Sequence, residues 1–390
     1  MFRIVASTSA ALAAAMLPVF LLGALTGELS QDLGFSEAEV GAAMTILFIV
    51  AGTAATPAGR LTERIGAAWS LRIGVALAAA VTALVGAWAT NWWQLAIPLA
   101  TVGVAIGLVD TGAARAYSDQ LTAAEQGRAF GLKEASVPTA SLLAGLAVPA
   151  MAAPHGWRWT FLTTVAIAAL VLVSLWRLGG RRGEPRSAGR EVERREPPSD
   201  AKTTSVTGPT IWLAAGVGLG AGAATAAAAF MVPALSDRGM TTSGAGFALS
   251  AASMASIAVR VVSGLWADRP SARPVGAVVV LCLIGSAAAA VLALPVAPLA
   301  VVGAAVVLLG AGWGWTGLAF LTAVRANPGA PAAAAGVVLT GLALGGALGP
   351  IAFGVLAARL SYTGAWIATA IALGVAAVTA FATRGAFRRP

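Results

Sequence analysis

Long apolar runs dominate this sequence, and they constrain its fold more than any other feature. A run of about 20 apolar residues is long enough to cross the ~30 Å hydrocarbon layer of a membrane as a helix. Backbone polar groups in lipid must bond within their own segment, so each run should be helical. The sequence predicts an all-α polytopic membrane protein with twelve transmembrane helices, at roughly 5–27, 37–58, 70–89, 94–116, 128–150, 159–177, 209–234, 244–265, 274–295, 298–323, 332–357 and 363–383.

Composition supports this reading against a soluble fold. Of the 390 residues, 58% are hydrophobic and 11% are charged, whereas soluble domains carry about 25% charged residues. The first apolar run follows Met-Phe-Arg, but it is too long for the apolar region of a signal peptide. We therefore expect it to be retained as a transmembrane helix.

The basic residues set the predicted orientation. Of 25 lysines and arginines, only Arg158, Arg238 and Arg359 fall on one side of the predicted membrane, which leaves 22 on the other. This is the positive-inside bias, so both termini are expected in the cytoplasm. The net charge of +9 is then explained by topology and does not indicate nucleic-acid binding. The high alanine, glycine and arginine content is typical of a GC-rich genome. We expect a multi-pass protein of a bacterial cell (inner) membrane.

A charged stretch divides the chain in two. Residues 177–208 carry eight bases and five acids with almost no apolar residue, which is typical of a cytoplasmic linker. The predicted organisation is a six-helix bundle over 1–176, the linker, and a second six-helix bundle over 209–390. Landmarks recur at one spacing, because Gly59 and Gly264, and also Gly131 and Gly336, lie 205 residues apart. A shared offset indicates a duplicated, pseudo-symmetric unit.

The most distinctive repeated landmark is a charged turn. The stretch GRLTERIGAA begins at Gly59, and GLWADRPSAR begins at Gly264. Such a turn can merely stop a helix, but two copies in register favour a gate whose charges pair with helix ends. The residues assigned to gating are Gly59, Glu63, Arg64, Gly66, Gly264, Asp268 and Arg269. We expect the glycines to allow close helix approach.

These features resemble the major facilitator superfamily over essentially the whole chain. The first turn resembles the family pattern G-x-L-a-D-r-x-G, with Glu63 in place of the usual aspartate, and the second copy lacks the final glycine. The resemblance implies two parallel six-helix bundles that hold a substrate between them near the membrane midplane. It also implies alternating access, in which the two bundles rock and the charged turns form part of a gate.

Charged residues inside predicted helices are the candidate functional residues, because their burial in lipid is costly. Asp110 and Lys133 lie at equal depth, about 9 Å from the inner boundary at ~1.5 Å per residue, and should form an ion pair. That pair either fixes packing or couples substrate or proton binding to the gate. Glu134 points about 100° away from Lys133 on a helix; it either pairs with Arg115 or faces the inner cavity mouth.

Arg260 has no counterpart in the duplication, because the matching residue is Ala55. Its place four residues before Gly264 resembles that of an arginine in monocarboxylate-type facilitators, which implies contact with a substrate carboxylate. Guanidinium groups bind planar anions through two parallel hydrogen bonds. The alternative is an arginine that extends to the inner membrane interface.

Three further segments bear on the site. GLKEASVPTASLLAGLAVP resembles a stretch of cyanate- and nitroimidazole-type facilitators, which implies that Lys133 faces the interface between the halves. Trp313 and Trp315 in GAGWGWTGLAF either line a cavity or pack in the protein. The glycines of GLALGGALGP, Gly341 to Pro350, are expected to permit close helix packing.

The function predicted is secondary active transport of a small solute, and the solute expected is an organic anion held by Arg260, Lys133, Trp313 and Trp315. Asp110, Glu134 and Arg115 are assigned to coupling, with protons as one coupling ion. The alternative is proton-coupled efflux of amphipathic drugs or secondary metabolites, and a non-transporting receptor is a third reading. We expect no enzyme activity, cofactor or metal site, since the sole cysteine, Cys282, and the sole histidine, His155, form no catalytic or ligand set. We also expect no nucleic-acid partner. The expected partners are membrane lipid and a small-molecule substrate, with the chain acting as a monomer.

Overall fold

The computed structural model describes residues 2–121, 129, 132–179, 208–267, 269, 272–327 and 331–385. Twelve helical segments among them are long and apolar enough to cross a membrane. This confirms the predicted all-α, polytopic fold class.

The N-terminal half comprises the described residues up to 179. Its elements are α1 (Phe2–Ala24), α2 (Thr26–Leu33), α3 (Glu37–Ile65), α4 (Ala67–Trp88), α5 (Trp92–Gln120), α7 (Ser136–Ala147), the π-helical turn η1 (Val148–Ala152), α8 (Ala153–His155) and α9 (Trp157–Gly179). Local sequence explains where α3 begins and ends. Ser36 and Glu39 form a reciprocal capping box at its start, and Gly66 adopts a φ of 83° at its end, a conformation that favours glycine.

The C-terminal half comprises the described residues from 208 onward. Its elements are α10 (Gly208–Ser236), α11 (Thr242–Ala267), α12 (Pro274–Leu292), α13 (Pro298–Gly314), α14 (Thr316–Ala326), α15 (Pro331–Arg359) and α16 (Tyr362–Thr383). The starts of α3 and α11, at Glu37 and Thr242, are 205 residues apart, as are the starts of α9 and α16, at Trp157 and Tyr362. These two pairs of helix starts therefore repeat at the spacing that the sequence indicated.

Two predicted helices differ from the structure. The run 298–323 was expected to be one helix, but it is divided at Trp315 into α13 and α14. The run 128–150 was expected to be helical from its start, yet residues 134–135 form a turn and the continuous helix α7 begins at Ser136. Both deviations lie next to residues that carry the candidate site.

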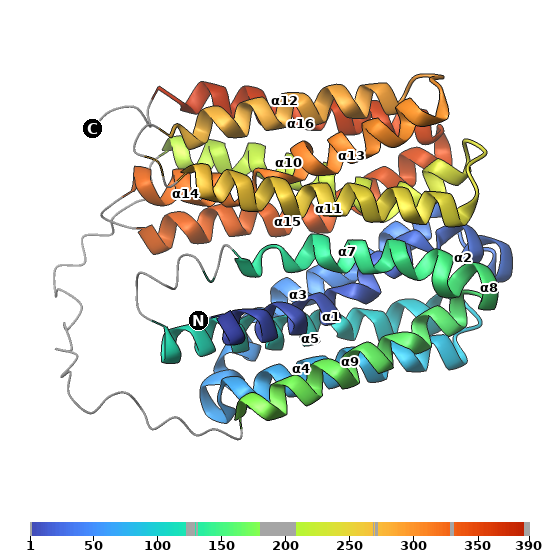
Figure 1. Cartoon of the computed structure of the whole chain (residues 1–390), viewed down its shortest axis with the longest axis horizontal. Coiled ribbons are helices and arrows are strands. Elements are labelled where there is room, and N and C mark those ends of the chain that lie inside the picture. The colour runs from blue at the N-terminus through green and yellow to red at the C-terminus, as the bar shows by residue number, and fades with distance from the viewer. Residues whose placement is uncertain are drawn as a thin grey trace.

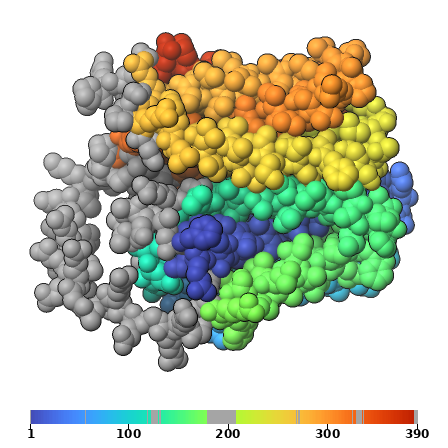
Figure 2. Space-filling model, viewed as in Figure 1, coloured from blue at the N-terminus to red at the C-terminus, as the bar shows by residue number. Residues whose placement is uncertain are grey.

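The two halves lie side by side with their helices roughly parallel (Figure 1). In the space-filling view, blue-to-green residues fill one half of the molecule and yellow-to-red residues the other, with α11 lying along α7 (Figure 2). We call the end where α1 begins, α9 ends and α10 begins the linker end, and the other end the distal end.

The halves meet closely at the distal end. A Cβ added to Gly41 near the start of α3 would lie 2.6 Å from the carbonyl oxygen of Pro350 in α15. On the other side of the interface, α7 and α11 meet in the same way, because a Cβ added to Gly246 of α11 would lie 2.6 Å from the carbonyl oxygen of Gly145 in α7. The Tyr362 hydroxyl also donates a 3.2 Å hydrogen bond to Glu37. All these residues lie in the distal parts of their helices.

Candidate functional site between the two halves

An ion pair between Asp110 and Lys133 forms the N-terminal part of the candidate site. The Lys133 ammonium contacts Oδ1 of Asp110 on α5, which confirms the pairing expected from their equal depth. The Lys133 side chain is 7% exposed, whereas that of Asp110 is 45% exposed. The carboxylate is thus the member of the pair that an entering proton or ligand can reach.

Glu134 lies closer to this pair than the sequence indicated. Its Oε1 is 3.8 Å from the Lys133 ammonium, so the expectation that the two side chains point to different faces is wrong. The 100° argument applies only within a helix, and Glu134 lies in the turn that precedes α7. The proposed pairing of Glu134 with Arg115 is also wrong, because Arg115 contacts Glu63 and Asp119.

Arg260 on α11 brings the C-terminal half to the same place. Its Nη1 donates to the Thr316 hydroxyl at the start of α14 and, at 3.5 Å, to the backbone carbonyl of Glu134 in the other half. Its Nε is buried and has no hydrogen-bond partner among the described residues. The side chain therefore lies in the protein interior, against the reading in which it extends to the membrane interface.

Trp313 lies beside Arg260 and also contacts the N-terminal half. The Arg260 guanidinium carbon lies 5.6 Å from the Trp313 ring centroid, within the range of a cation–π contact. The other neighbour of Trp313 is Phe20 of α1, with ring centroids 5.9 Å apart. Arg260, Trp313, Phe20 and Glu134 thus form one cluster across the interface between the halves.

Trp315 does not belong to this cluster. Its side chain is fully buried in the apolar core of the C-terminal half, and its indole N–H donates 2.7 Å to the carbonyl of Gly312. A Cβ on Gly220 of α10 would lie 2.8 Å from its ring. The expectation that Trp315 lines the substrate site is wrong, because the ring fills space inside one half and its polar atom is satisfied within its own segment.

The first charged turn forms its ion pairs inside the N-terminal half. Arg115 contacts Glu63 across the linker-end termini of α3 and α5, and its Nε lies 2.9 Å from Asp119 one helical turn away. In the second copy, Asp268 lies outside the described residues, while Arg325 donates 3.2 Å to the carbonyl of Ala267 at the end of α11. Arg64 and Arg269 are exposed.

The glycines of the charged turns do not serve the close approach that we expected. A Cβ on Gly59 would make only an ordinary 3.8 Å contact with Thr111, and one on Gly264 would meet nothing within 4 Å. Gly66 is required for a different reason, its φ of 83°. In this conformation, therefore, helix proximity explains neither Gly59 nor Gly264.

Sequence reasoning missed several residues that the structure places at or near the site. Phe20 and Thr316 carry no charge, and they become relevant only through contacts with distant segments. Tyr117 was detectable in principle, because it lies seven residues after Asp110 and hence on nearly the same face of α5. Its hydroxyl is 2.6 Å from that of Thr8 on α1, which ties the two helices together beside the ion pair.

The chain matches the Major Facilitator Superfamily over residues 4–338. It belongs to this superfamily. Members are membrane transporters rather than enzymes and typically act as single chains on small molecules, and this chain is a multi-pass membrane protein with their fold. Among curated proteins, none matches it in sequence.

Solved structures agree with this assignment at the level of fold. A bacterial homolog of the human lysosomal transporter Spinster, in an inward-facing and occupied conformation, is 15% identical with a TM-score of 0.75, covering 97% of this chain and 96% of its own. A D-xylose–proton symporter is 13% identical with a TM-score of 0.75 and 97% coverage of both chains. A nucleoside transporter variant is 15% identical with a TM-score of 0.73, covering 98% of this chain and 99% of its own.

Proposed function

We propose that this protein is a secondary active transporter of a small organic anion, bound between the two halves at Arg260. The observation that carries this proposal is the buried Nε of Arg260 without a hydrogen-bond partner among the described residues. An unpaired buried donor is costly, and a carboxylate would satisfy it with a charge-assisted hydrogen bond. Trp313 beside the guanidinium supplies an apolar wall for the rest of the solute.

The transport cycle that we propose is alternating access between the bundle 1–176 and the bundle 209–390, joined by the linker 177–208. The close contacts described above hold the halves together at the distal end, which supports a conformation that opens toward the linker end. We assign that end to the cytoplasm of a bacterial cell, an orientation that the positive-inside bias supports, and a single chain carries both halves of the site.

Charge balance at the site supports coupling to protons. Asp110 and Glu134 oppose Lys133 and Arg260, so in their ordinary ionisation states these four residues sum to zero. An entering monoanion would leave one uncompensated negative charge, which proton uptake by a carboxylate removes. Asp110 is the more exposed of the two carboxylates, and we assign it the coupling proton. Lys133 then holds Asp110 and Glu134 in place and does not bind the anion directly.

Uptake into proteoliposomes tests the proposal. Labelled small carboxylates should enter vesicles that contain the wild type, faster with an inward proton gradient, and Arg260→Gln should reduce uptake at least tenfold. Arg359→Gln is the matched control, because it removes an exposed arginine of the same half, at the end of α15 and outside both charged turns, and it should leave uptake unchanged.

Two outcomes would contradict it. Full carboxylate uptake in Arg260→Gln would remove Arg260 from the site. Flux of lipophilic cations with none of carboxylates would replace anion transport by the efflux of amphipathic compounds, for which the Trp313 and Phe20 rings would supply an apolar surface.

A further inference from the structure

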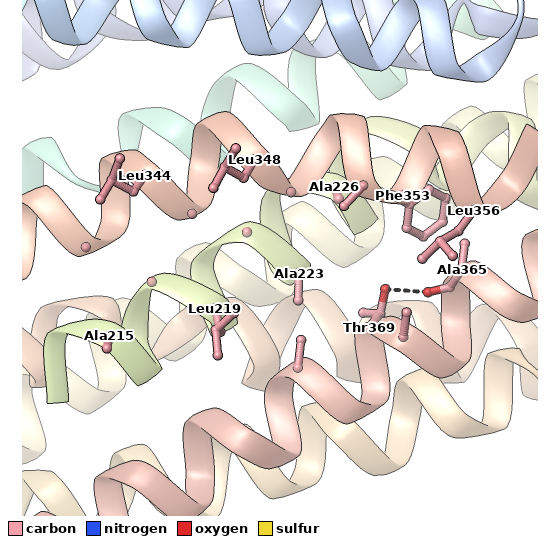
Figure 3. Close-up of a pocket in the computed structure, with 18 of the residues that line it drawn as sticks. Ala215, Leu219, Ala223, Ala226, Leu344, Leu348, Phe353, Leu356, Ala365 and Thr369 are labelled. Atoms are coloured by element: carbon pink, nitrogen blue, oxygen red, sulfur yellow. Dashed lines mark hydrogen bonds between the residues drawn. The ribbon is translucent and has the colours of Figure 1, made fainter. Parts of the chain in front are cut away.

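An apolar groove lies away from the interface between the halves, within the C-terminal half. Helix α10 forms its floor, and α15 and α16 form its walls (Figure 3). Its volume is about 300 Å³. Leu219 on the floor and Leu344 and Leu348 on one wall are each more than half exposed, at 51%, 59% and 59%. The groove is therefore open to the surroundings along its length.

Close packing of α10 against α15 builds this groove. Cβ atoms on Gly345 and Gly349 would lie 1.8 Å and 2.1 Å from the carbonyl oxygens of Gly218 and Gly222, so only glycine permits this separation. Close contact on one side of α15 leaves α16, which follows it in the chain, to cover the remaining face of α10. The floor on α10 and the wall on α16 are lined mainly by alanine, whose side chains are too small to fill the space.

The groove offers no free side-chain hydrogen-bond donor to a ligand. Thr369 is the sole hydroxyl among its lining residues, and that hydroxyl donates 2.9 Å to the carbonyl of Ala365 in its own helix (Figure 3). Every helix that forms the groove is a candidate membrane span. What enters it must be apolar, must come from the hydrocarbon layer, and needs no specific hydrogen bond.

The dimensions indicate which apolar molecule fits. The floor runs from Ala214 to Ala226, about 18 Å at ~1.5 Å per residue. Half of the ~30 Å hydrocarbon layer is about 15 Å, so the groove is about as long as one leaflet is thick. A single extended acyl chain has this length, and it is narrow enough to lie between two helices.

We infer that the groove between α10, α15 and α16 binds one acyl chain of a membrane phospholipid. The bound chain fills space that the alanines leave empty and supports the α15–α16 pair from the membrane side. This site does not involve Arg260 or the ion pairs, so it stands independently of the proposed substrate.

Native mass spectrometry of the purified full chain with added dioleoyl phosphatidylglycerol tests the inference. The double variant Ala223→Phe/Ala368→Phe fills the groove from its floor and one wall. Val378→Phe is the matched control, because it adds a ring on the outer face of the same helix α16, where Val378 is 67% exposed. The wild type and Val378→Phe should retain one phospholipid at collision energies that strip the others, and the filled variant should lose that occupancy at least tenfold.

Equal lipid retention in the filled variant and the wild type would overturn the inference. A dimer mass that the filled variant abolishes would also overturn it, since a second copy of the chain would then occupy the groove. If the double variant fails to fold, Ala215→Phe provides the same test, because Ala215 is exposed and lines the groove. Its lipid occupancy should fall, and unchanged occupancy would count against the site.

Discussion

The two halves repeat the same helices at one spacing, but they differ in what they bury. At the position where the N-terminal half carries Asp110, the C-terminal half carries Trp315, and the counterparts of Lys133, Glu134 and Arg115 are Val338, Leu339 and Phe320. The charged network of one half is thus replaced by apolar side chains in the other. Arg260 is the exception, because its counterpart is Ala55.

Matching helix pairs differ in the same direction. The C-terminal pair, α10 and α15, meets through glycines such as Gly218 and Gly345, whose counterparts in α1 and α7 are Ala13 and Ala140. The C-terminal half is therefore held by close backbone contact and an apolar core. The N-terminal half carries more charge near the interface. The two halves therefore share one scaffold but differ in the side chains that they carry at matching positions.

The largest expected effect concerns the matched positions 110 and 315. Trp315→Ala removes a fully buried ring and should lower the free energy of unfolding by about 3–5 kcal/mol. Asp110→Asn should cost far less, because the residue is half exposed and Lys133 keeps Glu134 as a partner. Thermal unfolding in detergent measures both. Equal losses of unfolding free energy would contradict the difference between the two halves, because both positions would then contribute equally to stability.

Glycine packing in the C-terminal half gives the next effect. Gly345→Ala places a Cβ 1.8 Å from a carbonyl oxygen of α10, and forcing these helices apart should cost about 3 kcal/mol or more. The neighbouring Gly346→Ala is the control, since its Cβ would meet nothing within 4 Å. It should gain up to about 1 kcal/mol from helix propensity. A harmless Gly345→Ala, judged by thermal unfolding, would refute the close packing.

Lys133→Met tests the charged network of the N-terminal half. It leaves Asp110 and Glu134 without their shared ammonium, and unsatisfied partly buried acceptors should cost about 1–3 kcal/mol. The double variant Asp110→Asn/Lys133→Met should lose less than the sum of the two single losses. Additive losses in thermal unfolding would mean that the two residues do not interact.

A smaller effect concerns Glu28, whose counterpart in the C-terminal half is Pro233. Burial raises the pKa of Glu28, and a hydrogen bond from the Trp157 backbone lowers it in part; the neighbouring charges are Asp32 and Arg158. Because its folded pKa is raised, protonated Glu28 favours the folded state. This contribution to stability is fully present below the unfolded pKa and is lost as pH rises through the folded pKa.

The matching experiment is a pH series of melting temperatures across that window. Glu28→Gln should flatten the decline with rising pH and should stabilise the protein at neutral pH. An unchanged pH profile in Glu28→Gln would show that the carboxyl is solvated in the folded state.

The smallest effect is expected at the first charged turn. Glu63 and Arg115 pair at 64% and 37% side-chain exposure, and exposed ion pairs contribute little to stability because solvent screens them. Glu63→Gln should leave thermal stability nearly unchanged, and any loss should shrink in high salt. If the turn is a gate, the same variant should change transport rate instead, which proteoliposome flux would detect.

Much of the fold was predictable from the sequence, because lipid imposes strong and local constraints. Apolar run length determines each span, and a common offset of 205 residues identifies the repeat. The break at Trp315 was not predictable, since Gly314 and Trp315 continue the apolar pattern without interruption. The depth argument paired Asp110 with Lys133 correctly. Asp110 lies on α5 and Lys133 lies just before α7, and these two helices are antiparallel neighbours in the chain.

The rest of the site depends on contacts that no local pattern encodes. Glu134 was placed wrongly because a helical angle was applied to a turn. Trp313 and Trp315 have equal aromatic character in the sequence, yet one lies at the interface and the other in the core, because the chain turns between them. The roles of Phe20 and Thr316 follow only from the arrangement of the two halves.

The central claim is that the C-terminal half adds one anion-binding cation, Arg260, to the charged network of the N-terminal half. A thermal-shift titration of purified protein with small carboxylates tests it most directly. A ligand at 100 times its dissociation constant adds about 2.7 kcal/mol of stability. The wild type and Arg359→Gln should be stabilised alike, Arg260→Lys partly, and Arg260→Gln not at all. An Arg260→Gln protein that is stabilised as strongly as the wild type would contradict the account.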